Sequence, residues 1–425
     1  MLQLRTARAE PGDDRYRFER ARHSDIVLQL APQGASFVWS QPGGRWDTAL
    51  LAIRVEHAAP APQIAITAGP ARVVQFLDEG AAGLRWLNLT SLASALRPGE
   101  PVSLEARGVR IAAASAQLAL FDNGLPAKPR VLVLAPHPDD AEIAAFALYA
   151  SHAARATIAT ITAGNGGFAS YQASFAGDVA GQYLFKGTLR TIDSVSVPWL
   201  GGVPPQRCVN LGYFDEQLEA MHASPRAPVR EAYRDNRDVG VYRRFNLSSL
   251  VPRGAREARW DHLVQDLTSL LRKVQPQLLV APHPQLDSHA DHAFTTVALS
   301  EALARAGLPV RVLLYTNHAD SDRYPYGPAG SVMSLPPSRT DELVIPGVYA
   351  LPVPAALVRQ KSFALEAMHD LRPAPQLAPG ESRELSDYLR RAPRSEELFY
   401  VYDRAGLRAL VHAFLAARAA TPSPR

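Results

Sequence analysis

VLVLAPHPDDAEIAAFAL, residues 131–148, joins an apolar run, a polar cluster and the start of a helix without a break. Its first five residues are uniformly apolar, which is typical of a parallel strand covered on both faces. Asp139 and Asp140 then stand next to each other, close to His137. Because neighbouring carboxylates disfavour each other's ionised form, we expect a positive group beside them.

Strand and helix patterns alternate along the rest of this part of the chain. The segments concerned are TIATITAG (157–164), WDHLVQDLTSLLRKV (260–274), QLLVAPH (277–283), HAFTTVALSEALARAG (292–307) and VRVLLYTN (310–317). This alternation predicts an α/β fold with a mostly parallel sheet and helices on both of its faces. Residues 198–258 are rich in Arg, Pro and Gly, so we expect loops there, and loops of that length are often functional.

The first part of the chain has a different pattern, with short alternating stretches separated by Gly, Pro and Asn. They are DIVLQLA (25–31), SFVWSQ (36–41), ALLAIRVEHA (49–58), QIAITA (63–68), RVVQFLD (72–78), VSLEARGVRIAAA (102–114) and QLALFD (117–122). Such spacing predicts an all-β, sandwich-like domain over residues 1–125, with one short helical turn at SLASALRPGE. The linker FDNGLPAKPR (121–130) leads into a second domain over residues 129–425.

The composition excludes several classes of protein. The chain has 425 residues, 47% of them hydrophobic and 20% charged, which is ordinary for a globular protein. Its single cysteine, Cys208, rules out an intramolecular disulfide framework or a multi-cysteine metal cluster. The net charge of +4 comes without a compact basic run, so we expect no nucleic-acid partner. The sequence has no signal-peptide pattern and no 18-residue apolar run, so we expect a cytoplasmic protein without a transmembrane segment.

A second polar cluster follows the strand pattern QLLVA. It reads PHPQLDSHADHA, residues 282–293, and contains His283, Asp287, His289, Asp291 and His292. Ligands of open parallel sheets bind at the carboxyl ends of the strands, where both clusters lie. Imidazole and carboxylate ligands suit zinc or a related first-row ion, which would supply the missing positive charge.

Simpler interpretations exist for each residue alone. His137 could be a core or capping residue, and Asp139 or Asp140 could be the N-cap of the following helix. The segment HADH could be the polar start of the next helix. The loop GNGGF (164–168) lacks the complete dinucleotide-binding pattern, so a turn is the better interpretation. Trp39, Trp46 and Trp86 could contact a glycan or be buried aromatics. The clustering of histidines at two strand ends nevertheless favours a metal site.

Together, APHPDDAE and the downstream D-x-H-x-D-H resemble the LmbE-like, or PIG-L, family of metal-dependent N-deacetylases. The resemblance extends over residues 129–402 and includes ITAGNGGF, Arg190, LGYFD (211–215), KSFALEAMHD (361–370) and RSEELFYVYD (394–403). Pro136 replaces the usual alanine, and an alanine is inserted before Glu142. IAAFAL replaces the usual glycine-rich helix start. The resemblance implies a Rossmann-like catalytic domain.

Roles follow from the resemblance residue by residue. His137, Asp140 and His292 are the implied metal ligands, Asp139 is the general base, and His289 is the acid or oxyanion-stabilising histidine. Arg190 and Asp215 are implied contacts to sugar hydroxyls, although Arg190 could be a surface residue and Asp215 a helix cap. Two further assignments rest on position: His318 follows another strand and could bind substrate, and Asp287 or Asp291 could orient a ligand imidazole from behind.

The expected activity is zinc-dependent removal of an N-acetyl group from an N-acetylglucosamine-type sugar in a glycoconjugate or polysaccharide. Another divalent first-row metal is compatible with the same ligands. Two alternatives stay open: an amidase acting on a thiol-conjugate or other non-sugar amide, and a glycan-binding protein with a vestigial metal site. The expected partner is an N-acetylated sugar, and the front domain would be an accessory domain.

Overall fold

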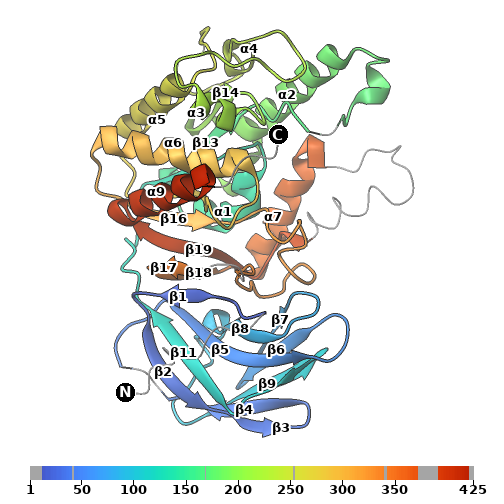
Figure 1. Ribbon diagram of the computed structural model, residues 1–425, viewed down its shortest axis with the longest axis vertical. Coiled ribbons are helices and arrows are strands. Elements are labelled where there is room, and N and C mark those ends of the chain that lie inside the picture. The colour runs from blue at the N-terminus through green and yellow to red at the C-terminus, as the bar shows by residue number, and fades with distance from the viewer. Residues whose placement is uncertain are drawn as a thin grey trace. The chain divides into compact units, whose positions relative to one another are not determined.

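The computed structural model describes residues 12–40, 43–167, 169–251, 254–338, 342–371 and 391–420. The chain forms two compact units (Figure 1). The first contains Met1–Gly124, Asp322–Pro354 and Arg394–Val401, and the second contains Leu125–Ser321, Ala355–Pro393 and Tyr402–Arg425. The division after Gly124 lies in the expected linker, but the first unit also takes two later segments. These two segments belong to the first unit because their strands pair with distant residues, and local sequence patterns do not reveal such pairing.

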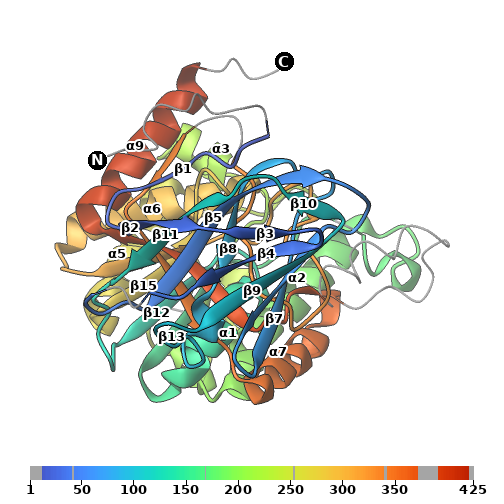
Figure 2. The same ribbon diagram turned by 90° about the horizontal axis from the view of Figure 1, so that it is seen from below.

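Ten strands of the first unit form two antiparallel sheets. They are β2 (Arg22–Val27), β3 (Gln29–Ala31), β4 (Gly34–Val38), β5 (Thr48–His57), β6 (Gln63–Ala68), β7 (Ala71–Phe76), β8 (Gly83–Asn88), β9 (Pro101–Arg107), β10 (Val109–Ile111) and β11 (Ser115–Phe121). One sheet has the order β10-β5-β11-β2 with β8 paired to β5, and the other has the order β3-β4-β9-β6-β7 (Figure 2). The expected helical turn is η1 (Thr90–Leu92), whereas none of the stretches expected to be strands corresponds to β8.

Both sheets contribute side chains to one hydrophobic core. Phe37 of the second sheet and Ile53 of the first belong to the same buried cluster, as the alternating patterns require. Trp39 and Trp86 are only 3% and 5% exposed, and Trp46 is partly buried against the core. These tryptophans therefore stabilise the first unit rather than offer an aromatic surface to a glycan.

Two further strand pairs of the first unit involve its later segments. The strands are β1 (Tyr16–Phe18), β17 (Leu343–Ile345), β18 (Gly347–Pro352) and β19 (Glu396–Asp403). β1 pairs with β17 in parallel, although they lie far apart in the sequence, and β18 pairs with β19 antiparallel from Gly347 to Pro352. This pairing is the reason that the front unit does not end at the linker.

Five strands of the second unit lie parallel in the order β14-β13-β12-β15-β16. Their bounds are β12 (Val131–Ala135), β13 (Ala156–Thr162), β14 (Cys208–Tyr213), β15 (Leu278–Pro282) and β16 (Arg311–Tyr315). Apart from Arg311, every residue of these strands is buried, which accounts for their continuous apolar patterns.

Helices connect these strands and pack on them. They are α1 (Asp140–Ser151), α2 (Val179–Ser196), α3 (Leu218–Ala223), α4 (Gly240–Arg243), α5 (Trp260–Val274), α6 (Ala290–Ala306), α7 (Ala355–Ala367) and α9 (Arg404–Ala420). Short 3-10 turns are η2 (Ala153–Arg155), η3 (Gln172–Ser174), η4 (Val197–Gly201), η5 (Pro205–Arg207) and η6 (His369–Leu371). α6 packs between α5 and α9, whereas α1 packs on β12 and α7. Among the described residues, no helix has the length and hydropathy needed to span a membrane.

The segment 198–258 combines loops with short regular elements. It contains β14, α3, α4 and short 3-10 turns, but most of its described residues lie in loops, as expected, and the strand was not anticipated. β14 contains the polar Asn210 and Gly212, whose φ is 71°, so it lacks the continuous apolar run by which β12 and β15 were recognised. This strand matters because Asp215 follows it directly.

Candidate active site

The carboxyl ends of all five parallel strands meet around one polar cluster. Asp139 follows β12, Gly164 follows β13, and Asp215 follows β14. His289 and His318 follow β15 and β16. The parallel sheet thus brings together residues that are distant in the sequence, as the strand-end argument predicts.

Three donor atoms from the predicted metal ligands form a small triangle within this cluster. His137 Nδ1 lies 3.4 Å from Asp140 Oδ2, and His292 Nε2 lies 3.1 Å from that oxygen and 3.3 Å from His137 Nδ1. All three side chains are buried. Donors that bind a tetrahedral ion at about 2.0–2.2 Å must be roughly 3.3–3.5 Å apart. The triangle therefore has the dimensions and the donor types of a metal site.

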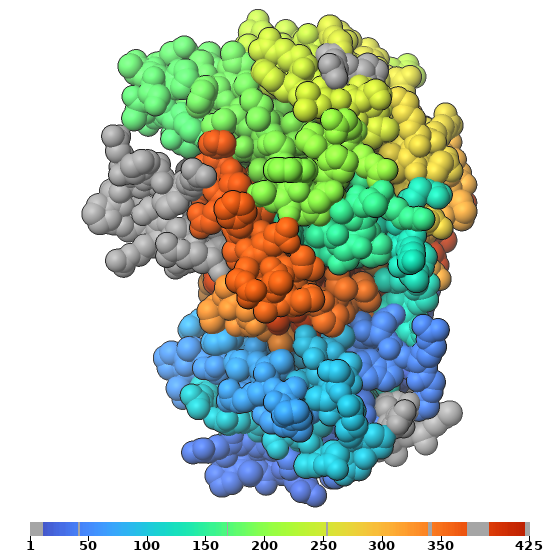
Figure 3. All heavy atoms as spheres, turned by 180° about the vertical axis from the view of Figure 1, so that it is seen from behind, coloured from blue at the N-terminus to red at the C-terminus, as the bar shows by residue number. Residues whose placement is uncertain are grey.

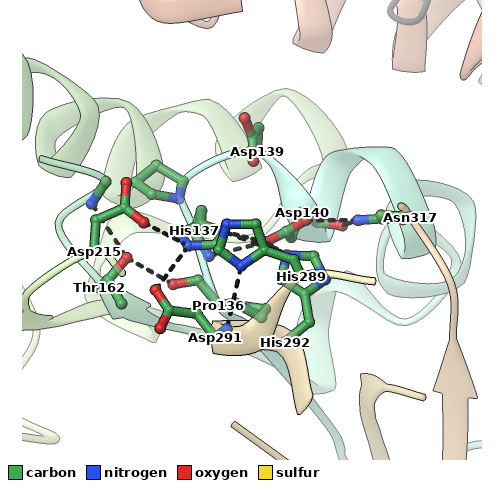
Figure 4. A network of polar contacts seen from close by, with 12 residues as sticks. Pro136, His137, Asp139, Asp140, Thr162, Asp215, His289, Asp291, His292 and Asn317 are labelled. Carbon is green, nitrogen blue, oxygen red and sulfur yellow. Dashed lines mark hydrogen bonds and ion pairs between the residues drawn. The ribbon is translucent and has the colours of Figure 1, made fainter. Parts of the chain in front are cut away.

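Acidic side chains support the two imidazoles from behind (Figure 4). His137 Nε2 lies 2.9 Å from Asp215 Oδ1 and 3.2 Å from Asp291 Oδ2. His292 Nδ1 lies 3.0 Å from Asp287 Oδ2. Each imidazole thus has one nitrogen directed at the triangle and the other held by carboxylates, an arrangement that orients metal-ligating histidines.

Asp140 is held equally firmly. Its Oδ1 accepts a hydrogen bond of 2.7 Å from Asn317 Nδ2, and its Oδ2 accepts one of 2.9 Å from the backbone N–H of His137. This carboxylate accordingly does not cap α1 through the usual N2 or N3 amide. Its position is fixed by the residues after β16 and by the turn after β12, so the oxygen of the triangle has little freedom to move.

The electrostatics of the cluster indicate surplus negative charge. Burial alone would lower the pKa of His292, but the carboxylates of Asp140 and Asp287 raise it to about 10. Burial likewise opposes the shift at His137, whose pKa Asp215 and Asp140 raise well above its ordinary value. The carboxylates therefore favour positive charge at the imidazoles. A divalent cation in the triangle would meet the same demand with both imidazoles neutral.

The cluster offers more than one set of three donors. Besides the triangle, donor atoms lie within 4.8 Å of one another in three groups: His137, His289 and His292; Asp140, His292 and His318; and His137, Asp215 and Asp291. His137 and His292 recur among these groups. The described residues therefore contain a His/Asp cluster that could hold a metal ion.

Asp139 lies beside the triangle in an unusual backbone conformation. Its φ is 137°, which side-chain-bearing residues rarely adopt and which costs free energy that the surroundings must offset. Arg190 Nη2 donates hydrogen bonds of 2.9 Å to Asp139 Oδ2 and to the carbonyl of Pro138. Burial raises the pKa of Asp139 to about 6, although Arg190 opposes the shift. Asp139 is the N-cap residue of α1 by position, but its side chain makes no capping hydrogen bond, so N-capping does not account for its carboxylate.

His289 is the N-cap of α6 and is partly exposed. Its Nδ1 accepts a hydrogen bond of 3.2 Å from the backbone N–H of Asp291, so the proton of the neutral ring is on Nε2. Burial and the neighbouring histidines lower its pKa to about 3. The ring lies 4.6 Å from that of His137, between centroids. A neutral N–H donor is thus available beside the triangle.

The loop after β13 joins Asp215 and Arg190 to the cluster. Gly166 N donates to Asp215 Oδ2 at 3.1 Å, and a Cβ on Gly164 would meet Arg190 Nε at 2.7 Å. Gly164 also has a φ of 61°. Arg190 and Asp215 are 8% and 7% exposed, so Arg190 is not a surface residue, and Asp215 contacts His137 rather than capping a helix. Phe168, the last residue of GNGGF, lies outside the described residues.

Sequence reasoning missed three residues that the structure places here. Asn317 lies in YTNH (315–318), a strand end that was expected to face the site, but only His318 of this stretch was assigned a role. Asp370 Oδ2 lies 3.4 Å from Arg190 Nη1 and 3.3 Å from Lys186 Nζ. Asp370 belongs to KSFALEAMHD, whose position gave no indication of where its carboxylate points. Lys186 lies one helical turn before Arg190, and that spacing on α2 was the available signal.

His283 and His318 illustrate two outcomes for strand-end histidines. His283 Nε2 lies 3.3 Å from the hydroxyl of Tyr402, and burial lowers its pKa to about 3, which is typical of a core histidine. The His318 ring lies 4.9 Å from that of His292 and is partly exposed. Of these two, His318 therefore faces the cluster.

One family model matches part of the chain. Residues 132–303 match the family model described as PIG-L, GlcNAc-PI de-N-acetylase. None of the curated proteins compared with the chain matches it.

Three solved structures show similarity at low identity. N,N'-diacetylchitobiose deacetylase from Pyrococcus horikoshii is 18% identical, with 67% of this chain and 88% of that chain covered and a TM-score of 0.40. GalB, the 4-carboxy-2-hydroxymuconate hydratase from Pseudomonas putida, is 12% identical, with coverages of 69% and 91% and a TM-score of 0.34. The conserved protein TT1542 from Thermus thermophilus is 19% identical, with coverages of 64% and 94% and a TM-score of 0.30. From the family match, residues 132–303 of this chain form a PIG-L (LmbE-like) domain.

Proposed function

We propose that this protein is a zinc-dependent hydrolase that removes the N-acetyl group from an N-acetylglucosamine-type sugar within a glycoconjugate or polysaccharide. The observation that carries the proposal is the triangle of donor atoms at His137, Asp140 and His292, with the carboxylate of Asp139 beside it. The proposal includes a Rossmann-like catalytic domain. Cytoplasmic location stays a prediction from the sequence.

Hydrolysis of an acetamide needs a nucleophile stronger than neutral water. Bound zinc would lower the pKa of a water molecule from 15.7 to about 7 and polarise the acetyl carbonyl. Three protein ligands leave the fourth tetrahedral position open for that water. His137, Asp140 and His292 are the residues that would hold the ion.

Asp139 is the proposed general base. A base must be largely ionised at the working pH yet basic enough to accept a proton, so a pKa of about 6 in this buried carboxyl suits the role. Arg190 fixes its position through the hydrogen bond to Oδ2. The water's proton therefore passes to a carboxylate that is adjacent to the ligand Asp140, which explains why two aspartates stand together.

His289 is the proposed donor on the substrate side. Its neutral Nε2–H can donate to the acetyl oxygen as negative charge develops there, and its low pKa supports this hydrogen-bonding role. Protonation of the departing amine then uses the proton that Asp139 accepted, directly or through His289. The net change is one C–N bond broken and one water consumed, with acetate and the free amine as products.

Arg190, Asp215 and His318 remain the proposed substrate contacts. His318 is partly exposed, and the other two are buried beneath the cluster. The observed contacts of Asp215 with His137 and Gly166 also support a positioning role. Asp287 and Asp291 are the residues proposed to orient the two imidazoles, and their distances of 3.0 Å and 3.2 Å from the imidazole nitrogens support that role.

The direct test is amine release from N-acetylglucosamine compounds with added zinc and after chelation. The panel runs from the free sugar to oligosaccharides and to inositol- and lipid-linked forms. Metal-dependent release from any member supports the proposal. Silence across the panel, with one metal ion bound per chain, would contradict sugar deacetylation and favour the other amides considered above. A chain that binds no metal would favour the vestigial-site alternative.

A further inference from the structure

A cavity in the second unit lies along α2 from the polar cluster. Its volume is about 200 Å³, and its walls come from the 169–179 segment, the start of α2 and Tyr233. The residues of α2 in its wall are Val179, Gln182 and Tyr183. Figure 3 shows the surrounding segment in green at the upper left, on the surface of this unit.

The wall of the cavity is connected to the catalytic cluster by hydrogen bonds. Tyr183 donates from its hydroxyl to the carbonyl of Gly167 at 2.8 Å, and Lys186 donates to the carbonyl of Gly166 at 2.6 Å. Gly166 in turn donates to Asp215. Gln182 and Arg190 both belong to α2, about 12 Å apart along the helix axis. The cavity is therefore separated from Arg190 by about 12 Å along α2, so an occupant would be a part of the substrate other than the acetamide.

One buried polar group in the wall has no partner. Gln182 is only 3% exposed, and its Oε1 makes no hydrogen bond among the described residues. Leaving such an acceptor buried and unsatisfied costs about 1–3 kcal/mol of free energy, and a hydrogen-bond donor of a ligand in the cavity would remove this cost. Gln172 adds a second carboxamide to the wall.

Aromatic rings form the other part of the cavity. The rings of Tyr183 and Tyr233 are stacked, with 3.7 Å between their centroids and 7° between their planes, and Tyr233 is still 39% exposed. Phe175 also lines the cavity. Aromatic walls with a few placed polar groups are the usual composition of a small-molecule site.

The lining restricts the chemistry of the occupant. Its described residues include no Lys or Arg, and Asp178 adds a carboxylate, so a phosphate or other anion is disfavoured. An acyl chain would leave the carboxamides unsatisfied. A neutral ring with hydroxyl donors satisfies Gln182 and packs its C–H face on the aromatic side chains. The volume is below the roughly 300–1,000 Å³ of pockets for drug-sized ligands, so it has room for a single ring.

From these features we propose that the cavity binds a neutral sugar ring adjacent to the N-acetylated sugar, so that oligosaccharides are the preferred substrate class. This inference rests on the proposed deacetylase function and narrows it. Tyr233 supplies the platform for the ring, and Gln182 accepts a hydrogen bond from one of its hydroxyl groups. Inositol phosphate and lipid conjugates are then poorer substrates.

Calorimetric titration of the metal-free full chain with N-acetylglucosamine and with N,N',N''-triacetylchitotriose separates this inference from catalysis. We expect the trisaccharide to bind more tightly. Tyr233→Ala and Gln182→Leu should each reduce the ratio of trisaccharide to monosaccharide affinity by about fivefold or more, the size of one aromatic contact or one lost hydrogen bond. Trp199→Ala, which removes an aromatic residue that is 66% exposed outside the cavity, should keep the ratio.

Two outcomes of this titration would contradict the inference. Equal binding of the two probes by the wild type, or an unchanged ratio in both cavity variants, would overturn the inference. Deacetylation assays on the same two probes then distinguish the causes of failure. Turnover of N-acetylglucosamine with no preference for the trisaccharide would support the deacetylase function and contradict the sugar site in the cavity. Selective trisaccharide binding without any amine release supports the cavity and contradicts the deacetylase.

Discussion

Arg190 bridges two carboxylates: its Nη2 lies 2.9 Å from Asp139 Oδ2 and its Nη1 lies 3.4 Å from Asp370 Oδ2. The guanidinium is buried, so its charge acts through a medium of low polarity and is strongly felt. It holds Asp139 in an uncommon backbone conformation and opposes the rise of its pKa. The reactivity of the proposed base is thus set by a residue on α2.

Asp139→Asn should separate catalysis from metal binding. The amide keeps the size of the side chain, and Asn tolerates positive φ comparatively well. It cannot accept the water's proton, so kcat should fall by about 10²- to 10⁴-fold, while one zinc per chain is retained. Metal analysis and amine release on the same sample measure both quantities. Full turnover by this variant would show that another residue is the base.

His292→Ala should abolish both properties, because it removes one corner of the donor triangle and leaves Asp287 without the imidazole it supports. We expect zinc content to fall well below one per chain and activity to be lost with it. His152→Ala, a histidine at the end of α1 outside the cluster, is the matched control and should bind zinc normally. Unchanged metal content in His292→Ala would eliminate the proposed ligand set.

The pH dependence of kcat/KM should respond to the charges around Asp139. The base is active when ionised, so activity falls as the pH drops below its pKa. Arg190 lowers that pKa, and Arg190→Gln should therefore move the acidic limb to higher pH. Asp370→Asn removes a competing carboxylate from Arg190, so the limb should move to lower pH. Parallel shifts of both variants in one direction would contradict this account.

The sequence predicted four of the five parallel strands, all but β14, and the two polar clusters, because each of these signals is local. β12 and β15 are continuous apolar runs, and the residues that follow them are of the metal-ligating types. Helix α5 was predicted with the bounds that the structure shows, Trp260–Val274, because its apolar side chains recur at helical spacing. Topology then brings the strand ends together without any further information from the sequence.

Other features depend on contacts that no local pattern encodes. Asp370 reaches Arg190 only because η6 packs against α2, and the long chain between them offers many other partners for either charge. β1 pairs with β17, which assigns a late segment to the front unit. Asn317 is an ordinary polar residue until its hydrogen bond to Asp140 is seen. Such roles become visible only with the three-dimensional arrangement.

Gly164→Ala tests the close approach of the β13 loop to Arg190. A Cβ at this position would lie 2.7 Å from Arg190 Nε, and φ is 61°, so the substitution should displace the guanidinium or the loop. We expect at least tenfold lower kcat/KM with zinc still bound, because the triangle itself is untouched. Gly254→Ala is the matched control, since a Cβ there meets nothing within 4 Å. Wild-type activity in Gly164→Ala would show that the loop absorbs the methyl group without moving Arg190.

A buried carboxyl in the front unit should make its stability depend on pH. Glu396 accepts hydrogen bonds from Asn88 Nδ2 at 2.6 Å, from Ser91 N at 3.1 Å and from the Ser91 hydroxyl. Burial nevertheless raises its pKa from 4.5 to about 7. The folded state therefore binds this proton more tightly than the unfolded chain does, and stability falls as the pH rises from about 4.5 to about 7.

Glu396→Gln should remove that dependence, because an amide does not ionise. The free energy of unfolding of the variant relative to the wild type should rise between about pH 4.5 and pH 8 by up to about 3 kcal/mol, from 1.36 kcal/mol per pKa unit. At the acidic end the variant should be the less stable of the two, since it has one oxygen fewer to accept from Asn88 and Ser91. Denaturant unfolding at several pH values measures the difference, with the exposed Glu79→Gln as control. Parallel pH profiles for Glu396→Gln and the wild type would mean that Glu396 is ionised in the folded protein at no cost, with its three donors compensating fully for burial.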